Sequence, residues 1–143
     1  MTIAKAYGLA MQSVFNGEID FDTATVKCML ASSSYTPDQD VHRYKSSITN
    51  EVTGTGYTAG GVTLSGKTVT YNTSTNTLTL DANDPVWTAS TFTARFGIFY
   101  VSTGVDATSP LLCYYDFETD QSVVGNSFTI QLPATGLIYG VVA

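Results

Sequence analysis

The glycines of residues 50–61, NEVTGTGYTAGG, are the first feature that could do chemistry. Gly54, Gly56 and Gly60 have a G-x-G-x-x-x-G spacing, and residues 61–68 match the bare Walker pattern, with Lys67 at its end. A phosphate-binding loop of this kind works only where a helix follows the glycines, because the helix N-terminus meets the phosphate. The residues after Lys67 alternate apolar and hydroxyl side chains, which predicts a strand. We therefore interpret the segment as a system of turns and loops.

The chain offers few residues for catalysis. His42 is the only histidine, and it lies in a polar stretch without a recognisable nucleophile motif. Cys28 and Cys113 each lie within apolar residues, which favours buried free thiols, although a single bridge between them stays open. One histidine and two separated cysteines make a zinc site improbable. We expect no catalytic residue, no metal and no cofactor, and hence a protein that is not an enzyme.

Carboxylates occur in pairs along the chain. Two carboxylates can hydrolyse a glycoside, and clustered oxygens can bind calcium. None of these pairs lies in a twelve-residue calcium-binding loop, and aspartate is also an ordinary turn residue. The segment DANDP (81–85) is the one that we keep as a candidate for a weakly bound calcium ion. The pairs are Asp20 with Asp22, Asp38 with Asp40, Asp81 with Asp84, and Asp116 with Glu118 and Asp120.

Aromatic side chains are the remaining resource for binding. They make up 12% of the residues. Tyrosine and tryptophan anchor many interfaces, but they also fill the cores of β-sandwiches, and the core interpretation comes first here. A sugar-binding platform is a further possibility. The aromatic residues considered are Tyr35, Tyr44, Tyr57, Trp87 and Tyr139.

The composition favours one all-β domain. The 143 residues are the size of a single domain, so we predict one domain over 1–143. Only 13% of the residues are charged, and the polar positions are largely threonine and serine, which favour strands and turns. The net charge of −6 argues against nucleic acid or an anionic membrane as partner. The first fifteen residues lack the pattern of a secretory signal, and no apolar run is long enough for a membrane span.

The expected strands come mainly after the glycines. Residues 62–64, 67–71 and 77–80 alternate apolar and polar side chains, with a hairpin loop at NTSTN. Residues 91–101 are apolar on both faces, as a central buried strand would be. Residues 111–117, 127–132 and 137–142 complete the set. We predict an antiparallel β-sandwich, either jelly-roll or immunoglobulin-like, with a short helical turn or a loop around residues 36–48.

The N-terminal residues fit two patterns. Ile3, Tyr7 and Ala10 match one face of a helix, whereas Tyr7, Leu9 and Met11 match strand alternation. Asn16-Gly17 is the strongest short signal for a hairpin turn. We favour a strand that enters such a hairpin, followed by extended chain through residues 25–30.

Three segments resemble a family of small virion proteins of tailed bacteriophages. They are D-x-x-T-x-K-x-x-L at 22–30, Y-x-P-x-Q-D-x-H at 35–42 and N-E-V-x-G-T-G-Y-T-A-G-G at 50–61, followed by VWTASTFTARFGIFY at 86–100. The resemblance covers most of the chain. It implies a virion structural protein, with decoration of the head the favoured role, and it supplies no catalytic residues.

That resemblance sets the functional expectation. The protein would coat or cement the outer surface of the capsid, with the major capsid protein and further copies of itself, as a homotrimer, for partners. It would be made in the host cytoplasm and would then belong to the virion. The alternative is a receptor- or carbohydrate-binding module of a tail or fibre. The predicted interface residues are Tyr35, His42, Arg43, Tyr44, Tyr57 and Trp87.

Overall fold

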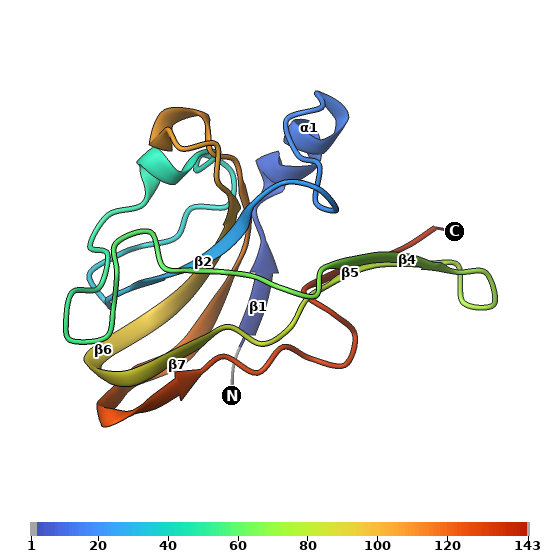
Figure 1. Ribbon diagram of the computed structural model, residues 1–143. Helices are drawn as coiled ribbons and strands as arrows, with labels where there is room; N and C mark the ends of the chain where they lie inside the picture. The colour runs from blue at the N-terminus through green and yellow to red at the C-terminus, as the bar shows by residue number, and fades with distance from the viewer. Residues whose placement is uncertain (1–2, 143) are drawn as a thin grey trace.

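The computed structural model describes residues 3–142 as two antiparallel sheets with one short α-helix (Figure 1). The larger sheet has the strand order β1-β7-β6-β2-β3, and the smaller has the order β4-β5-β8. This confirms the predicted all-β, sandwich-like fold. The elements are β1 (Ile3–Ala6), α1 (Gly8–Phe15), β2 (Val26–Ala31), the 3-10 turn η1 (Lys45–Ser47), β3 (Val62–Thr63), β4 (Thr68–Asn72), β5 (Thr77–Asp81), β6 (Val86–Val101), the 3-10 turn η2 (Asp106–Thr108), β7 (Leu111–Thr129) and β8 (Ile138–Val141).

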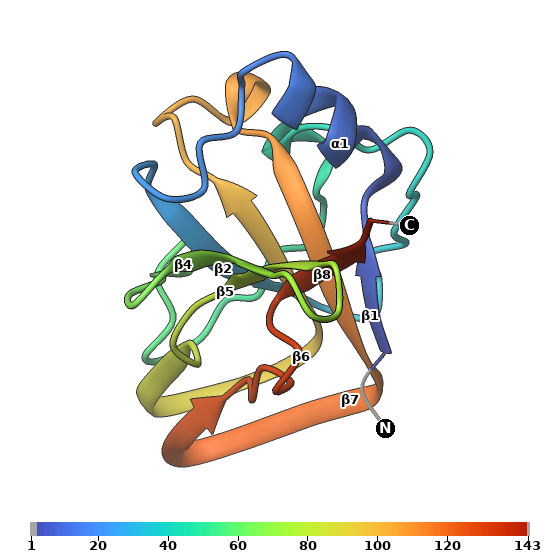
Figure 2. The ribbon, with the colours of Figure 1, turned by 90° about the vertical axis from the view of Figure 1, so that its right-hand side faces the viewer.

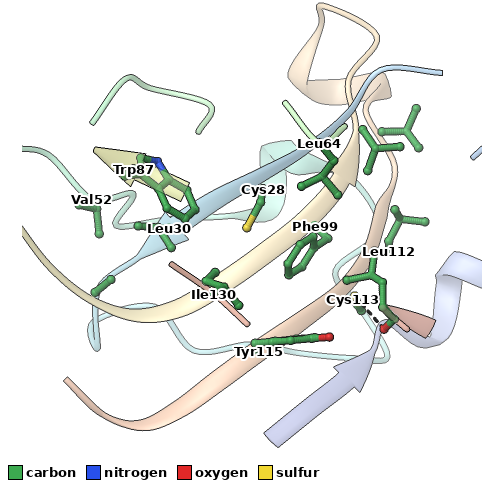
Figure 3. Close-up of a cluster of buried hydrophobic side chains, with 14 of the residues drawn as sticks. Cys28, Leu30, Val52, Leu64, Trp87, Phe99, Leu112, Cys113, Tyr115 and Ile130 are labelled. Atoms are coloured by element: carbon green, nitrogen blue, oxygen red, sulfur yellow. Dashed lines mark hydrogen bonds between the residues drawn. The ribbon is translucent and has the colours of Figure 1, made fainter. Parts of the chain in front are cut away.

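Strand β2 is buried on both faces, and so are residues 96–101 of β6 and 111–115 of β7. Successive side chains of a strand point to opposite faces, so one apolar run contributes side chains to a core on each face of the sheet. In β6, Phe99 packs in the first core, while Ile98 and Tyr100 pack in the second. The two-sided burial predicted for residues 91–101 is confirmed for residues 96–101, whereas residues 91–95 are buried on one face only. Figure 3 shows the first core, where Cys28, Leu112 and Tyr115 lie around Phe99.

Strand β7 is longer than the sequence predicts. Residues 111–117 and part of 127–132 belong to one strand, Leu111–Thr129, so the prediction of two separate strands is wrong. The pairing of β7 with β6 shifts register at four places, which lets a long ribbon bend without breaking its hydrogen bonds. The polar segment 118–126 is paired with β6 through such irregularities, and its composition alone suggests a loop. Figure 2 shows the bent ends of β6 and β7 below the body of the larger sheet.

The N-terminal prediction of a strand and hairpin is wrong beyond residue 6. Residues 8–15 form α1, with Ala10 and Ser13 buried on one side. Asn16-Gly17 ends the helix in place of making a hairpin turn. Gly17 has φ 74°, its N–H donates to Val14 O, and Glu18 N–H donates to Ser13 O. This is the Schellman arrangement, for which glycine is favoured because an L side chain resists positive φ.

The segment 36–48 is mostly irregular, with η1 as its one helical turn, as predicted. It covers the second core together with the start of α1. Tyr35 and Ile48 from this region pack against that core. Among residues 3–142, no helix is long and apolar enough to cross a membrane.

The smaller sheet, which we call the arm sheet, projects from the body on the same side as α1 (Figures 1 and 2). Its hairpin of β4 and β5 and the return strand β8 confirm the strands predicted near 67–71, 77–80 and 137–142. Directly paired residues share a face, so the register sorts the side chains. One face is apolar and the other is rich in threonine. The apolar face consists of Val69, Tyr71, Leu78, Leu80 and Ile138, and the threonine face includes Thr68, Thr70, Thr77 and Thr79 together with Tyr139 and Val141 of β8.

Candidate functional site: an apolar groove between the helix and the arm sheet

An apolar groove of about 560 Å³ separates α1 from the arm sheet. Met11 and Val14 line it from the helix, while Leu78 and Ile138 line it from the sheet. The apolar face of the arm sheet is therefore turned toward the helix, and the threonine face is turned away from it. The name "α1–arm groove" refers below to this depression, whose floor is formed by Ala6, Ile19, Phe21 and Leu112.

Most of the residues around the groove remain in contact with solvent. Phe15 at the end of α1 is 84% exposed, and Tyr71 at the outer part of the arm sheet is 51% exposed. Phe15 lies four residues after Met11, so the two side chains share one face of the helix. A sheet with one apolar face is normally covered by another layer. Here Leu80 and Ile138 pack against the first core, while Val69, Tyr71 and Leu78 stay open as a surface that another molecule can cover.

Lys67 fixes the base of the arm sheet to the body. Its Nζ donates to Phe21 O at 2.9 Å and to Asp22 O at 3.2 Å, and it also contacts Ala24 O. Lys67 is the residue that completes the Walker-like pattern, but its ammonium is occupied by these carbonyl groups. The strand β4 follows it directly, as predicted, so the pattern is not a phosphate-binding loop. Lys67 therefore holds the base of the arm sheet beside the groove floor.

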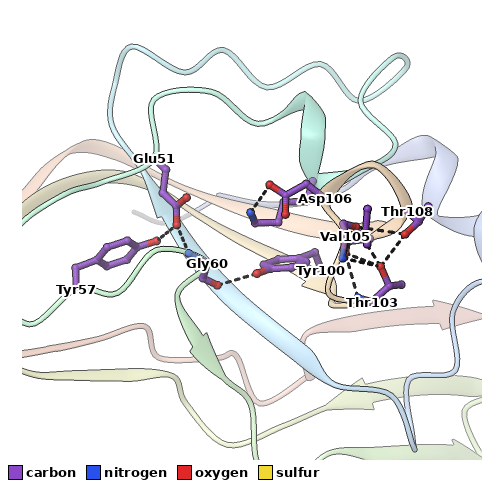
Figure 4. Close-up of polar contacts among 10 residues, drawn as sticks. Glu51, Tyr57, Gly60, Tyr100, Thr103, Val105, Asp106 and Thr108 are labelled. Atoms are coloured by element: carbon purple, nitrogen blue, oxygen red, sulfur yellow. Dashed lines mark hydrogen bonds and ion pairs between the residues drawn. The ribbon is translucent and has the colours of Figure 1, made fainter.

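The glycine segment 50–61 packs against the larger sheet (Figure 4). Glu51 Oε1 accepts hydrogen bonds from Tyr57 O–H and Gly60 N–H, and Tyr100 O–H donates to Gly60 O at 2.8 Å. Gly61 has φ 75°, and a Cβ on it would lie 1.8 Å from Cys28 O. The glycines thus allow a close approach between the loop and β2. This confirms the interpretation of the segment as turns and loops.

Two of the predicted interface residues are buried in the core. Trp87 and Tyr35 are each 2% exposed, so neither offers a surface to a partner in this conformation. The Trp87 ring stacks on Tyr57 with a centroid distance of 6.3 Å. The Tyr57 hydroxyl is engaged by Leu30 N–H and Glu51, and burial raises its pKa. These aromatics do not form the open platform that a sugar would need.

The predicted interface residues His42, Arg43 and Tyr44 lie beside the C-terminal end of α1. His42 Nδ1 accepts the Asp38 N–H and contacts the Tyr35 hydroxyl at 2.9 Å. Burial raises the pKa of Tyr35 to about 12, so this hydroxyl is neutral near pH 7. Arg43 and Tyr44 both bind Glu18, with Arg43 Nη2 to Oε1 at 2.7 Å. This cluster holds the 36–48 segment to the end of α1, and an interface there stays a prediction.

The two cysteines and the DANDP segment, the remaining candidates for chemistry, make contacts that stabilise the fold. Cys28 and Cys113 are free and buried, as favoured, and desolvation raises the pKa of both thiols. In the DANDP segment, Asp81 accepts the Ala82 N–H and Asp84 accepts the Leu132 N–H. Within residues 3–142, no three His, Cys, Asp or Glu side chains gather as metal ligands would.

The α1–arm groove escapes sequence reasoning because its parts come from four separate stretches of chain. The signal that could have found it is the alternation of apolar and threonine residues in the two strands of the arm-sheet hairpin, β4 and β5. Such alternation implies one apolar face, but the sequence does not say whether that face is covered. Comparisons of the chain with models of known protein families, with curated proteins and with solved structures found no match.

Proposed function

We propose that this chain is a structural subunit of a bacteriophage particle, which coats the outer surface of the head shell and cements the major capsid protein. The observation that supports an assembly role is the open apolar surface formed by α1 and the arm sheet. Residues 22–61 and 86–100 supply the resemblance that points to a virion. The proposal includes association of the chain with itself, as a trimer, on the capsid lattice.

The physical argument begins with the arm sheet. An apolar sheet face that stays in water gives up the stabilisation that burial would provide, roughly 25 cal/mol per Å². The surface carries few charges, since α1 contains no charged residue, the three arm strands contain only Asp81, and the groove lining adds Asp20 and Asp22. Interfaces are depleted of charge at their centres in the same way. A surface of this kind suits a protein that acts by association.

Quantitative mass spectrometry of purified particles tests the proposal. The expected result is hundreds of copies per particle, in a fixed ratio to the major capsid protein. A few copies per particle would place the chain on a tail or fibre and would contradict the decoration role. Detection in infected-cell lysate but never in purified particles would contradict the virion role altogether.

A further inference from the structure

We infer that the α1–arm groove is covered by a second copy of this chain, whose own apolar arm face packs into it. The inference rests on the proposed structural function and deepens it by naming the surface and its occupant. Six exposed side chains make up this assembly surface. Met11, Val14, Val69 and Leu78 line the groove. Phe15 and Tyr71 lie beside the lining, Phe15 one helical turn after Met11 and Tyr71 paired with Leu78.

The exposed apolar area is of the size that a stable contact needs. A fully exposed aromatic side chain presents roughly 150–250 Å², and the transfer energies of aliphatic side chains correspond to roughly 60–120 Å² each. Scaled by their exposures of 39–84%, the six side chains present about 300–550 Å². One side of a standard interface buries about 800 Å², of which a little under 500 Å² is apolar. The assembly surface therefore matches the apolar share of one such side.

The strand edges of the arm sheet are open as well. In the part of the chain that the structure describes, β4 and β8 each pair only with β5. Natural proteins protect exposed edge strands with charged residues or proline. The sequence of β4 is TVTYN and that of β8 is IYGV, without charge and without proline. An unprotected edge beside an open apolar face indicates a region that is covered in the working assembly.

The uncharged side chains of the assembly surface permit a second copy as the occupant. The chain carries a net charge of −6, so two copies repel each other through most of their surfaces. The six exposed side chains are uncharged, and Asp20 and Asp22 are the charged residues of the groove lining, so two such surfaces can meet with most of the charge held apart. The arm sheet also supplies the complementary shape, because its apolar face is the kind of layer that packs on another sheet at about 10 Å. The threonine face stays on the outside, where hydroxyl groups are solvated.

The test is the mass of the purified chain by sedimentation velocity at about 1 and 100 µM. The expected result is a discrete oligomer at the higher concentration. Tyr71→Thr and Phe15→Gln should each weaken association at least tenfold, because both side chains are exposed and contribute most of the aromatic area. The matched control is Val124→Thr, whose side chain is 73% exposed and lies on β7, outside both α1 and the arm sheet, and it should associate as the unchanged chain does.

Two results would overturn the inference. One is a single-chain mass at 100 µM for the unchanged protein. The other is undiminished association of both variants, with circular dichroism showing that they are folded. Binding of a single-chain form to purified capsid shells would assign the surface to another partner and leave the proposed function standing. An oligomer that depends on Tyr71 and Phe15 but is absent from virions would instead remove the proposed function and keep the self-association.

Discussion

Tyr57 joins the glycine segment to β2 through its hydroxyl group. The oxygen accepts Leu30 N–H at 3.0 Å, and the hydrogen is donated to Glu51 Oε1 at 2.8 Å. Tyr57→Phe leaves both partners without this hydroxyl in a largely dry environment. We expect the free energy of unfolding to fall by about 1–3 kcal/mol, measured by urea denaturation.

Tyr139→Phe is the control for that measurement, since Tyr139 is 57% exposed. Its loss should stay within about 0.5 kcal/mol. Equal losses for the two variants would show that the Tyr57 hydroxyl does not stabilise the loop.

Asp116 stabilises β7 through Arg95 of the neighbouring strand. Arg95 Nε donates to Asp116 Oδ1 at 2.6 Å, and this hydrogen bond holds the pKa of the carboxyl below its usual value. Because the folded-state pKa is the lower one, the ionised carboxylate stabilises the fold above about pH 4 and loses that effect as the pH falls. Asp116→Asn should therefore lower stability at pH 7, and the difference from the unchanged chain should shrink at pH 2.5. A difference that is constant over this range would contradict the ionic origin.

At the scale of elements, the glycine loop depends on its approach to β2. At Gly61 an added Cβ would meet Cys28 O, whereas at Gly104 it would meet no atom within 4 Å. Both residues have positive φ, so alanine at either position destabilises the fold by about 1–2 kcal/mol through its backbone conformation alone. Gly61→Ala adds a clash with backbone that a strand cannot easily relieve. Its cost should exceed the range of about 0.5–3 kcal/mol that most substitutions span.

Thermal and urea unfolding of Gly61→Ala and Gly104→Ala provide the comparison. Equal stability of the two variants would mean that the loop moves away from β2 at little cost. It would also mean that the glycine segment does not need its close packing.

An element can be predicted from the sequence where neighbouring residues alone determine its structure. The hairpin of β4 and β5 follows from alternation and a polar loop, and the two-sided burial at the end of β6 follows from its apolar run at residues 96–101. Asn16-Gly17 misleads because the same pair can end a helix or turn a hairpin, and only the packing of Ala10 decides between them. The continuity of β7 through residues 118–126 depends on register shifts against β6, which its polar sequence does not display.

The functional surface is less predictable than the fold. Aromatic residues are the natural candidates for an interface, but Trp87 and Tyr35 fill the two cores. Side chains that an alternation pattern would place in a core, such as Val69 and Leu78, lie open to solvent instead. Whether a face is covered depends on the arrangement of distant elements and on partners. The sequence of one chain carries neither of these directly.

At the scale of the whole molecule, the larger sheet lies between two cores, and one largely apolar surface stays open beside it. The larger sheet and its two cores fix the position of α1, and Lys67 fixes the arm sheet opposite it. The acidic remainder of the surface keeps copies apart except where this apolar surface meets another. We propose that copies of the chain assemble through the α1–arm groove.

Hydrogen–deuterium exchange at about 2 and 200 µM tests that claim most directly, because it shows which amides become covered. We predict slower exchange at the higher concentration in residues 8–15 and 68–72, with no change in the bent segment 118–126. Concentration-independent exchange in α1 and β4 would contradict the account. So would protection confined to residues 35–44, because the assembly contact would then lie at His42, Arg43 and Tyr44 and not at the groove.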